Sequence, residues 1–407
     1  MNVDELVRDT LRESAADTVS VPAGFADRVL AVRRRRRNRR IVAAAGVTAA
    51  VVAVAVAVPL LDGGDEVRPA SRMNSSDIIG HPDQSPPKDL IAAGDTVLAA
   101  FRVSKGVKQD NGDIVHTPTY GLLNQKTGRY EKTNKWAFLD VAPGSRTAAV
   151  LERELPADRI GLLDLITGKV DRWIPVDHGV GGVAFSPDGK KLVATTYAKN
   201  PDRDYVDHPM KVNGKRQPGP APSRTGFSVV DVASGESDWH EVPPPEDEFH
   251  FSSINSREDF DWSHDGSLVF TGLSSEPFRQ YYDLNGDETG VPVGEKHVGY
   301  PEAGLSPNGK LVAGDFAGSG REIAVAVNDA KTGKRAYKLP AQQLLAWADD
   351  KRLIAWGCDP EKCAGKGEFR NQLLLVTIGT NKVVPLSGFR KASDDYPGRW
   401  NPIFGTR

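Results

Sequence analysis

Side chains that could do chemistry are few and widely spaced in this 407-residue chain. The eight histidines do not fall at metal-ligand spacing, and neither HExxH nor GxSxG occurs anywhere in the sequence. Asp283, Asn285 and Asp287 have the spacing of the first three ligands of a calcium-binding loop. However, the glycine of this segment falls at the fourth position instead of the sixth, and no glutamate occupies the twelfth. We interpret the segment as a hairpin turn and expect no cofactor, no metal and no catalysis.

The two cysteines, Cys358 and Cys363, are separated by four residues. A zinc site would need two further ligands nearby, and a redox-active pair would more typically be CxxC. In an exported domain such a pair indicates a local disulfide that closes a loop.

Seven arginines precede a long uncharged segment and indicate a membrane topology. They are Arg33, Arg34, Arg35, Arg36, Arg37, Arg39 and Arg40. Residues 41–61 carry no charge and would span about 31 Å as a helix, which matches the thickness of a bilayer core. Because positive charge favours the inner side, we expect residues 1–40 to be cytoplasmic and the chain from Asp62 onward to be exported. A cleaved signal peptide has a shorter basic region and a shorter apolar core, so we prefer a single-pass anchor in the cell membrane with the lipid bilayer as a partner.

The charge balance differs on the two sides of this segment. Residues 1–40 carry ten basic and six acidic side chains, and the remaining chain carries 42 basic and 48 acidic ones. A mildly acidic exported part argues against nucleic acid as its partner.

The first forty residues contain a short amphipathic pattern. Val3, Leu6, Val7 and Leu11 fall at helical spacing, and charged residues lie between them. Residues 1–40 resemble the cytoplasmic heads of zinc-less anti-sigma factors, which implies transmembrane signalling through a cytoplasmic regulator bound at residues 1–40. The alternative is a tail that only sets topology and holds anionic lipid.

Two short patterns alternate beyond a polar segment, 62–88, that we predict to be a disordered linker. The first pattern, a strand, a tight turn and a strand, begins at positions 91, 141, 185, 262, 305 and 347. The second pattern, a strand and a turn, begins at positions 122, 162, 229, 281, 327 and 375. One copy of each pattern makes a unit of roughly 40–50 residues, and a repeat of this period predicts a propeller or a solenoid. Two hairpins in series make a four-stranded blade, and Phe185, Trp262, Leu305 and Trp347 should pack between blades.

The segment FSPDGKKLVA at 185 with VVDVASGE at 229 resembles the WD40-like repeat of TolB-type β-propellers. The resemblance implies an all-β fold over 89–407 with six blades, or seven if 243–256 or the tail 389–407 forms another. It implies no particular function.

A long insertion between the two hairpins of the third unit, 198–225, is the candidate binding loop. Its candidate side chains are Arg203, Tyr205, Met210, Lys211, Lys215 and Arg216. We predict a non-catalytic binding or scaffolding module, with an envelope protein or a glycan bound at the propeller mouth where the hairpin turns and this insertion gather. A propeller-fold lyase or glycosidase, with acidic residues converging in the channel, is the less favoured alternative.

Overall fold

The computed structural model describes residues 76–244, 257–273, 276–319, 322–358, 371–390 and 399–407. The chain divides into two compact units, Met1–Asp62 with Lys211–Lys215, and Gly63–Met210 with Arg216–Arg407. The predicted head, 1–40, and the predicted span, 41–61, lie outside the described residues. Among the residues that are described, no helix has the length and apolar character needed to cross a bilayer.

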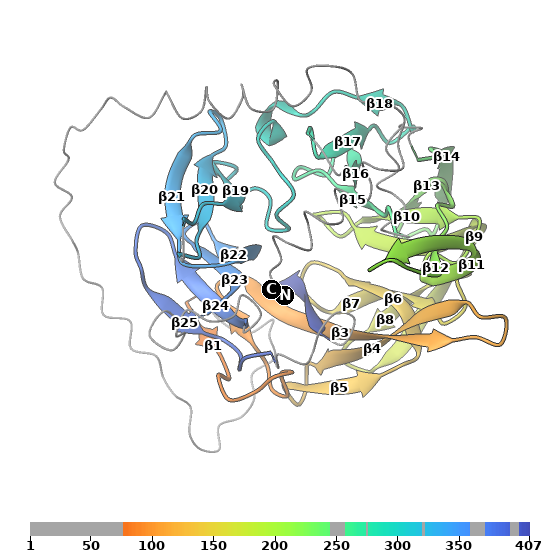
Figure 1. Cartoon of the computed structure of the whole chain (residues 1–407), viewed down its shortest axis with the longest axis horizontal. Helices are drawn as coiled ribbons and strands as arrows, with labels where there is room; N and C mark the ends of the chain where they lie inside the picture. Colours follow the sequence, from red (N-terminus) through yellow and green to blue (C-terminus); the bar gives the residue numbers. More distant parts are fainter. Residues whose placement is uncertain (1–75, 245–256, 274–275, 320–321, 359–370, 391–398) are drawn as a thin grey trace. The chain divides into compact units, whose positions relative to one another are not determined.

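Antiparallel strands make up the second unit, and the order of their pairing defines six blades (Figure 1). Blade 1 contains β26 (Trp400–Thr406), β3 (Thr96–Lys108), β4 (Ile114–Asn124) and β5 (Arg129–Thr133). Blade 2 contains β6 (Trp136–Val141), β7 (Thr147–Glu152), β8 (Ala157–Asp164) and the first half of β9 (Lys169–Phe185). Blade 3 contains the second half of β9 with β10 (Lys191–Tyr197), β13 (Arg224–Asp231) and β14 (Ser237–Glu241).

The remaining blades have shorter strands. Blade 4 contains β15 (Phe260–Trp262), β16 (Val269–Gly272), β17 (Arg279–Tyr282) and β18 (Glu288–Thr289). Blade 5 contains β19 (Leu311–Phe316), β20 (Val325–Asp329) and β21 (Arg335–Leu339), and a single bridge from Leu305 to Val312 marks its inner edge. Blade 6 contains β22 (Gln343–Asp349), β23 (Arg352–Gly357), β24 (Gln372–Thr377) and β25 (Val383–Pro385).

The last strand of the chain closes the ring of blades. β26 pairs with β3 from Trp400–Val103 to Thr406–Thr96, and it also contacts β6. Residues 399–407 therefore supply the inner strand of blade 1. They do not form a seventh blade, although the tail was one of the two possibilities predicted for one. The other predicted source of a seventh blade, 243–256, lies almost entirely outside the described residues.

Apolar clusters lie between consecutive blades, as expected for sheets that cannot bury their faces alone. Phe185 belongs to the cluster between blades 2 and 3, Trp262 to that between blades 3 and 4, and Trp347 to that between blades 5 and 6. These three positions confirm the prediction, whereas Leu305 is half-buried.

The predicted tight turns occur, although at position 305 only a single bridge, Leu305–Val312, joins the two sides, and the turns explain their sequences. In the turn after β9, Ser186 Oγ donates to Asp188 Oδ1 (2.7 Å), Gly189 N donates to the Ser186 carbonyl (2.8 Å), and Gly189 has a φ of 71°. Such a positive φ favours glycine. The Asp283–Asp287 segment is likewise a turn, because the Asp283 carboxylate accepts from the backbone N–H groups of Asn285 (2.8 Å) and Asp287 (3.0 Å).

The ordered domain begins earlier than the predicted boundary at residue 89. β1 (Ile78–Ile79) pairs with β2 (Ala92–Ala93), which in turn pairs with β3. Gln84 Nε2 donates to Asp89 Oδ2 (2.6 Å), and His81 forms a bridge with Ser387 in blade 6. Residues 76–88, predicted as part of a disordered linker, therefore pack against blades 1 and 6.

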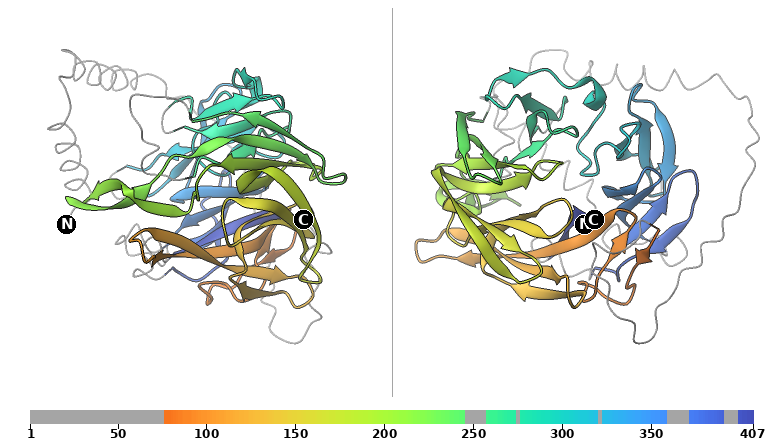
Figure 2. Two further views of the ribbon diagram at one scale, coloured as in Figure 1. Left: turned by 90° about the vertical axis from the view of Figure 1, so that its right-hand side faces the viewer. Right: turned by 180° about the vertical axis from the view of Figure 1, so that it is seen from behind.

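The insertion of blade 3 forms a β-hairpin of β11 (Arg203–Val212) and β12 (Lys215–Pro220). Its two ends are held together because Ala198 N donates to the Ser223 carbonyl (2.8 Å). We call residues 198–223 the second arm. The distal part of the β3–β4 hairpin, 104–118, is the first arm, and it too extends from the blades (Figure 2).

Candidate binding face

The two arms lie at the opposite end of the blades from the motif turns. β10 runs from the tight turn at 186–190 to the second arm, and β13 returns from the arm to the tight turn at 232–236. The predicted site, a mouth shared by the hairpin turns and the insertion, is therefore wrong, because antiparallel strands place successive connections at alternating ends. We call the end with the arms the arm face and the other end the turn face.

The arms are joined to each other by a short stretch of sheet. Arg203 and Asp204 of β11 pair with Val115 and Ile114 of β4, and His116 N donates to the Asp202 carbonyl (2.7 Å). With only two paired positions, the backbone contributes little of the contact.

Charged side chains supply the rest of this contact. His116 Nε2 lies 2.7 Å from Asp204 Oδ2. The Asp113 carboxylate accepts from Val206 N (2.9 Å) and lies 3.8 Å from the Arg203 guanidinium. The hydrogen bond to Asp204 raises the pKa of His116, against partial burial, and the bond from Val206 N lowers the pKa of Asp113. The junction is thus strengthened by charge.

Arg257 is the centre of a largely buried ionic cluster, with side chains 16–25% exposed, below the second arm. Its Nε and Nη2 donate to the two carboxylate oxygens of Asp202 (2.7 and 2.8 Å). Its Nη1 donates to the Gly181 carbonyl (2.7 Å) and to Asp259 Oδ2 (3.1 Å), and the guanidinium stacks 4.7 Å from the ring of Phe138. Although burial opposes the charged form, Asp259 and Asp202 raise the pKa of Arg257 well above its usual range. The cluster therefore fixes the base of the second arm to blades 2, 3 and 4.

Tyr197 completes the cluster from the end of β10. Its hydroxyl donates to Asp259 Oδ1 (2.8 Å) and accepts from Glu258 N (3.0 Å), and burial raises the pKa of Tyr197 well above its usual range. Two glycines make room for these side chains, since a Cβ on Gly181 would collide with the Tyr197 ring and one on Gly182 with the Asp259 carboxylate. The glycines in the segment 178–183 are the only sequence signal that could have pointed to this cluster.

A second buried arginine holds the backbone on both sides of residues 245–256. Arg224 donates through Nε to the Val242 carbonyl (3.2 Å), through Nη2 to the Pro243 carbonyl (3.1 Å) and through Nη1 to the Glu258 carbonyl (3.2 Å). Burial lowers the pKa of Arg224. Because it anchors residue 258, Arg224 also positions Arg257.

Three acidic side chains, those of Asp140, Asp261 and Glu302, have raised pKa values. Burial raises the pKa of Asp140 to about 7, a hydrogen bond from Phe185 N (2.7 Å) opposes this shift, and the charge of Asp261 adds to it. Partial desolvation also raises the pKa of Asp261 on β15 and of Glu302, although both residues keep exposed surface, and the charge of Arg102 opposes the shift at Glu302. The charges of Asp140 and Asp261 interact, and a convergence of acidic residues in the channel stays a prediction. Among the described residues, however, no group of His, Cys, Asp and Glu side chains has a metal-binding arrangement.

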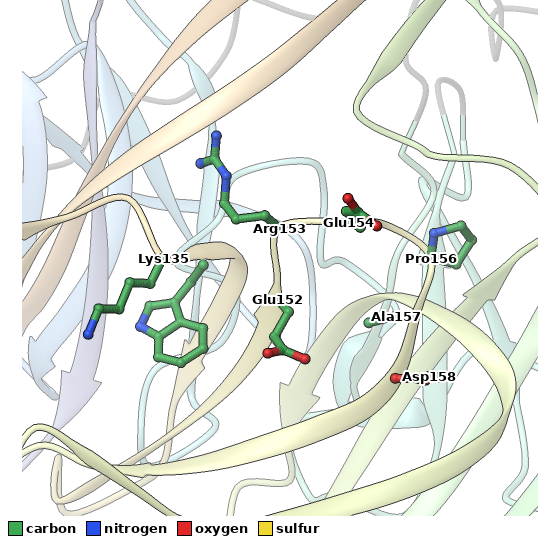
Figure 3. Close-up of a pocket in the computed structure, with 8 residues that line it drawn as sticks. Lys135, Glu152, Arg153, Glu154, Pro156, Ala157 and Asp158 are labelled. Atoms are coloured by element: carbon green, nitrogen blue, oxygen red, sulfur yellow. The ribbon is translucent and has the colours of Figure 1, made fainter.

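A pocket of about 680 Å³ opens beside the first arm, at the end of blade 2 (Figure 3). Its lining combines the charged side chains Lys135, Glu152, Arg153, Glu154 and Asp158 with Trp136, Pro156 and Ala157. Arg153 Nη1 donates to the Pro118 carbonyl of the first arm (3.1 Å), which places the pocket on the arm face. The pocket also adjoins the ionic cluster, because Ala157 pairs with Val180, next to Gly181.

The structure does not gather the six candidate side chains of the insertion into one site. Arg203 contacts Asp113, and Tyr205 donates to the Asn200 carbonyl (3.3 Å), so both take part in the packing of the arm. Met210 packs against Gly219, whereas Lys211, Lys215 and Arg216 are exposed.

Cys358 is disulfide-bonded, and its predicted partner, Cys363, lies outside the described residues. The seven arginines of 33–40 also lie outside them.

Comparison with known proteins shows similarity only at the level of structure. No family model matches the chain, and no curated protein matches it. Among solved structures, TolB from Acinetobacter baumannii is 14% identical over 70% of this chain, with a TM-score of 0.33, and the match spans 65% of that chain. Hydrazine synthase from Kuenenia stuttgartiensis is 14% identical, covering 66% of this chain and 78% of that one, with a TM-score of 0.34. The β-propeller domain of Myceliophteria thermophila Cps50 (Swd1) is 12% identical, covering 75% and 87%, with a TM-score of 0.36. At these scores the assignment of a propeller rests on the strand pairing described above.

Proposed function

We propose that this protein is a single-pass membrane protein whose exported β-propeller binds a partner through the arm face and catalyses no reaction. The arginines of 33–40 and the uncharged segment 41–61 support the anchor and its orientation. The contrast between the two ends of the blades carries the binding proposal: the turn face has short motif turns, whereas the arm face has two joined arms beside a pocket. Long connections on a rigid scaffold are where propellers and other folds carry binding function.

The ionic cluster supports a binding role for this face in preference to a catalytic one. General acid–base catalysis needs a carboxyl group that can exchange a proton with a substrate. Asp202 and Asp259 are instead bound by the same guanidinium, and Asp259 also accepts from Tyr197. These groups make the arm rigid, and a rigid arm loses little conformational freedom when a partner binds.

Site-specific photocross-linking in cells tests the binding proposal. A benzoylphenylalanine at Val206, 49% exposed on the second arm, is expected to give discrete adducts of higher mass after irradiation. The matched control places the same residue at Lys331, an exposed position in a tight turn of the turn face. Adducts from Lys331 but not from Val206 would contradict the proposal.

The topology is tested independently by adding protease to intact cells that carry a C-terminal epitope. We expect the epitope to be lost and an N-terminal epitope to remain protected. Protection of the C-terminal epitope in intact cells, together with its loss after lysis, would overturn the exported location.

A further inference from the structure

We propose that the pocket at the end of blade 2 is a saccharide-binding subsite that takes an uncharged oligosaccharide chain. This inference rests on the proposed function, since it names the ligand class for one part of the arm face. The volume of the pocket, about 680 Å³, lies within the range of small-molecule sites.

The strand register brings an aromatic, an acidic and a basic side chain into one row. Trp136 pairs with Glu152 across β6 and β7. Val150 pairs with Gly161 across β7 and β8, and the same antiparallel register, continued by two residues, places Arg159 opposite Glu152. Side chains directly opposite each other on neighbouring strands point to the same side of a sheet. Arg159 Nε and Nη2 both lie 2.8 Å from Glu152 Oε2, which confirms the contact.

A second tryptophan, Trp173, packs against the row formed by Trp136, Glu152 and Arg159. The guanidinium of Arg159 lies 4.4 Å from the ring of Trp173, whose centroid is 6.3 Å from that of Trp136. Gly161 leaves room for Trp173, since a Cβ there would come within 2.8 Å of its ring. The Glu152 carboxylate is therefore held in place while it stays 44% exposed and able to accept further hydrogen bonds.

The charges of the pocket do not favour an anionic or a cationic ligand. Lys135 and Arg153 are balanced by Glu152, Glu154 and Asp158, and Arg159 compensates the remaining negative charge. A nucleic acid or a polybasic peptide would meet repulsion from about half of these groups. Hydroxyl groups, which both donate and accept, can pair with carboxylates and with guanidinium or ammonium groups alike.

The backbone around the pocket does not suit an extended peptide. Peptides commonly bind by adding a strand to a free sheet edge. β7 and β8 are interior strands, whereas β6 is the edge strand of its sheet, and β26 contacts that edge without pairing with it. A sugar ring needs no such edge, because its apolar C–H face can pack on an indole while its hydroxyls reach the surrounding polar groups.

Calorimetric titration of the full-length protein tests the proposal directly. The protein is placed in nanodiscs, since alkyl glycoside detergents carry sugar headgroups, and titrated with cellotetraose, maltotetraose and chitotetraose. We expect at least one of these to bind with a Kd of about 1 mM or tighter. Trp136→Ala should weaken binding by about tenfold or more, and Glu152→Gln by about threefold or more.

Trp239→Ala is the matched control, since Trp239 stacks on His178 in blade 3 (3.8 Å between centroids), outside the pocket. Its binding constant should equal that of the unmodified protein. Absence of binding by all three oligosaccharides, or binding that both pocket variants leave unchanged, would overturn the proposal. Cross-link adducts from Val206 combined with no saccharide binding would remove only this inference, whereas absence of those adducts removes the proposed function itself.

Discussion

Arg257 is the residue on which the position of the second arm depends most. Its side chain is 16% exposed, and its partners Asp202 and Asp259 are 18% and 25% exposed. Removing one partner of a buried ionic cluster leaves the other charges without compensation. We therefore expect Arg257→Met to lower the free energy of unfolding by about 3 kcal/mol, measured by urea denaturation.

An exposed ion pair of the same type serves as the control for Arg257. Lys338 Nζ lies 2.6 Å from Glu322 Oε2, but these side chains are 35% and 53% exposed. Exposed pairs contribute little, so Lys338→Met should change the free energy of unfolding by less than about 1 kcal/mol. Equal losses in the two variants would show that the cluster has no special role in stability.

Asp140 makes a residue-level prediction about pH. Burial raises its pKa from 3.8 to about 7, so the neutral carboxyl group favours the folded state, and this contribution is lost as the pH rises through 7. Asp140→Asn keeps an oxygen that can accept from Phe185 N and never ionises. The loss accrues up to pH 7 at about 1.4 kcal/mol per pH unit, so between pH 5 and pH 8.5 the unmodified protein should lose about 3 kcal/mol more stability than the variant. A parallel pH dependence of the two proteins would contradict the expected shift.

The ionic cluster could not be predicted from the sequence. Arg257 lies 55 residues from Asp202 and 76 from Gly181, and no local pattern links positions at such separations. The turn at Asp283 was predictable as a local feature because its residues are a few positions apart. Gly181 and Gly182 were visible in the sequence, but a glycine indicates only that something approaches closely and does not say what approaches.

The second arm is the element that sequence reasoning described least well. The segment is predicted as a loop because it interrupts the repeat, and its residues Pro209, Pro218 and Pro220 disfavour interior strands. Pro218 and Pro220 are tolerated because β12 ends the path of strands in its sheet, and Pro209 because it lies in β11 beyond the two positions, Arg203 and Asp204, that pair with β4. The arm also lies on the face opposite to the motif turns, since chain direction reverses at every strand.

The junction between the arms predicts a pH-dependent element. The pKa of His116 is raised above 6.5, so the stabilisation from its charged form is complete below pH 6.5 and is lost as the pH rises through the higher, folded-state pKa. Urea denaturation of the unmodified protein and of Asp204→Asn should therefore differ more at pH 6 than at pH 8.5. A difference in stability that is the same at both pH values would exclude this contribution.

At the scale of the whole molecule, the repeat predicted the propeller because each unit encodes its own two hairpins. Turn residues and alternating apolar positions act over a few residues, so they can be recognised in the sequence without tertiary information. The closure of the ring could not be predicted from the sequence in this way. β26 has no motif of its own, and its partner β3 lies some three hundred residues earlier in the chain.

Trp400 makes the closure testable. It is 1% exposed, and its ring lies 4.9 Å from that of Trp356 in blade 6 and 5.8 Å from that of Phe101 in blade 1. Trp400→Ala should therefore destabilise the fold by about 3–5 kcal/mol in urea denaturation. Val293→Ala, at a position that is 93% exposed, should stay within about 0.5 kcal/mol of the unmodified protein.

The consequence of closure extends beyond the loss of one side chain. If β26 joins the two ends of the ring, weakening it should expose blade 1 and blade 6 together, since Trp400 contacts both. Hydrogen exchange in Trp400→Ala should then accelerate in β3 and in β23 and β24 to a similar extent, while β10 and β13 of blade 3 change less. Acceleration confined to β26 and β3 would mean that the last strand only covers an edge and that the ring is held by the contacts between blades alone.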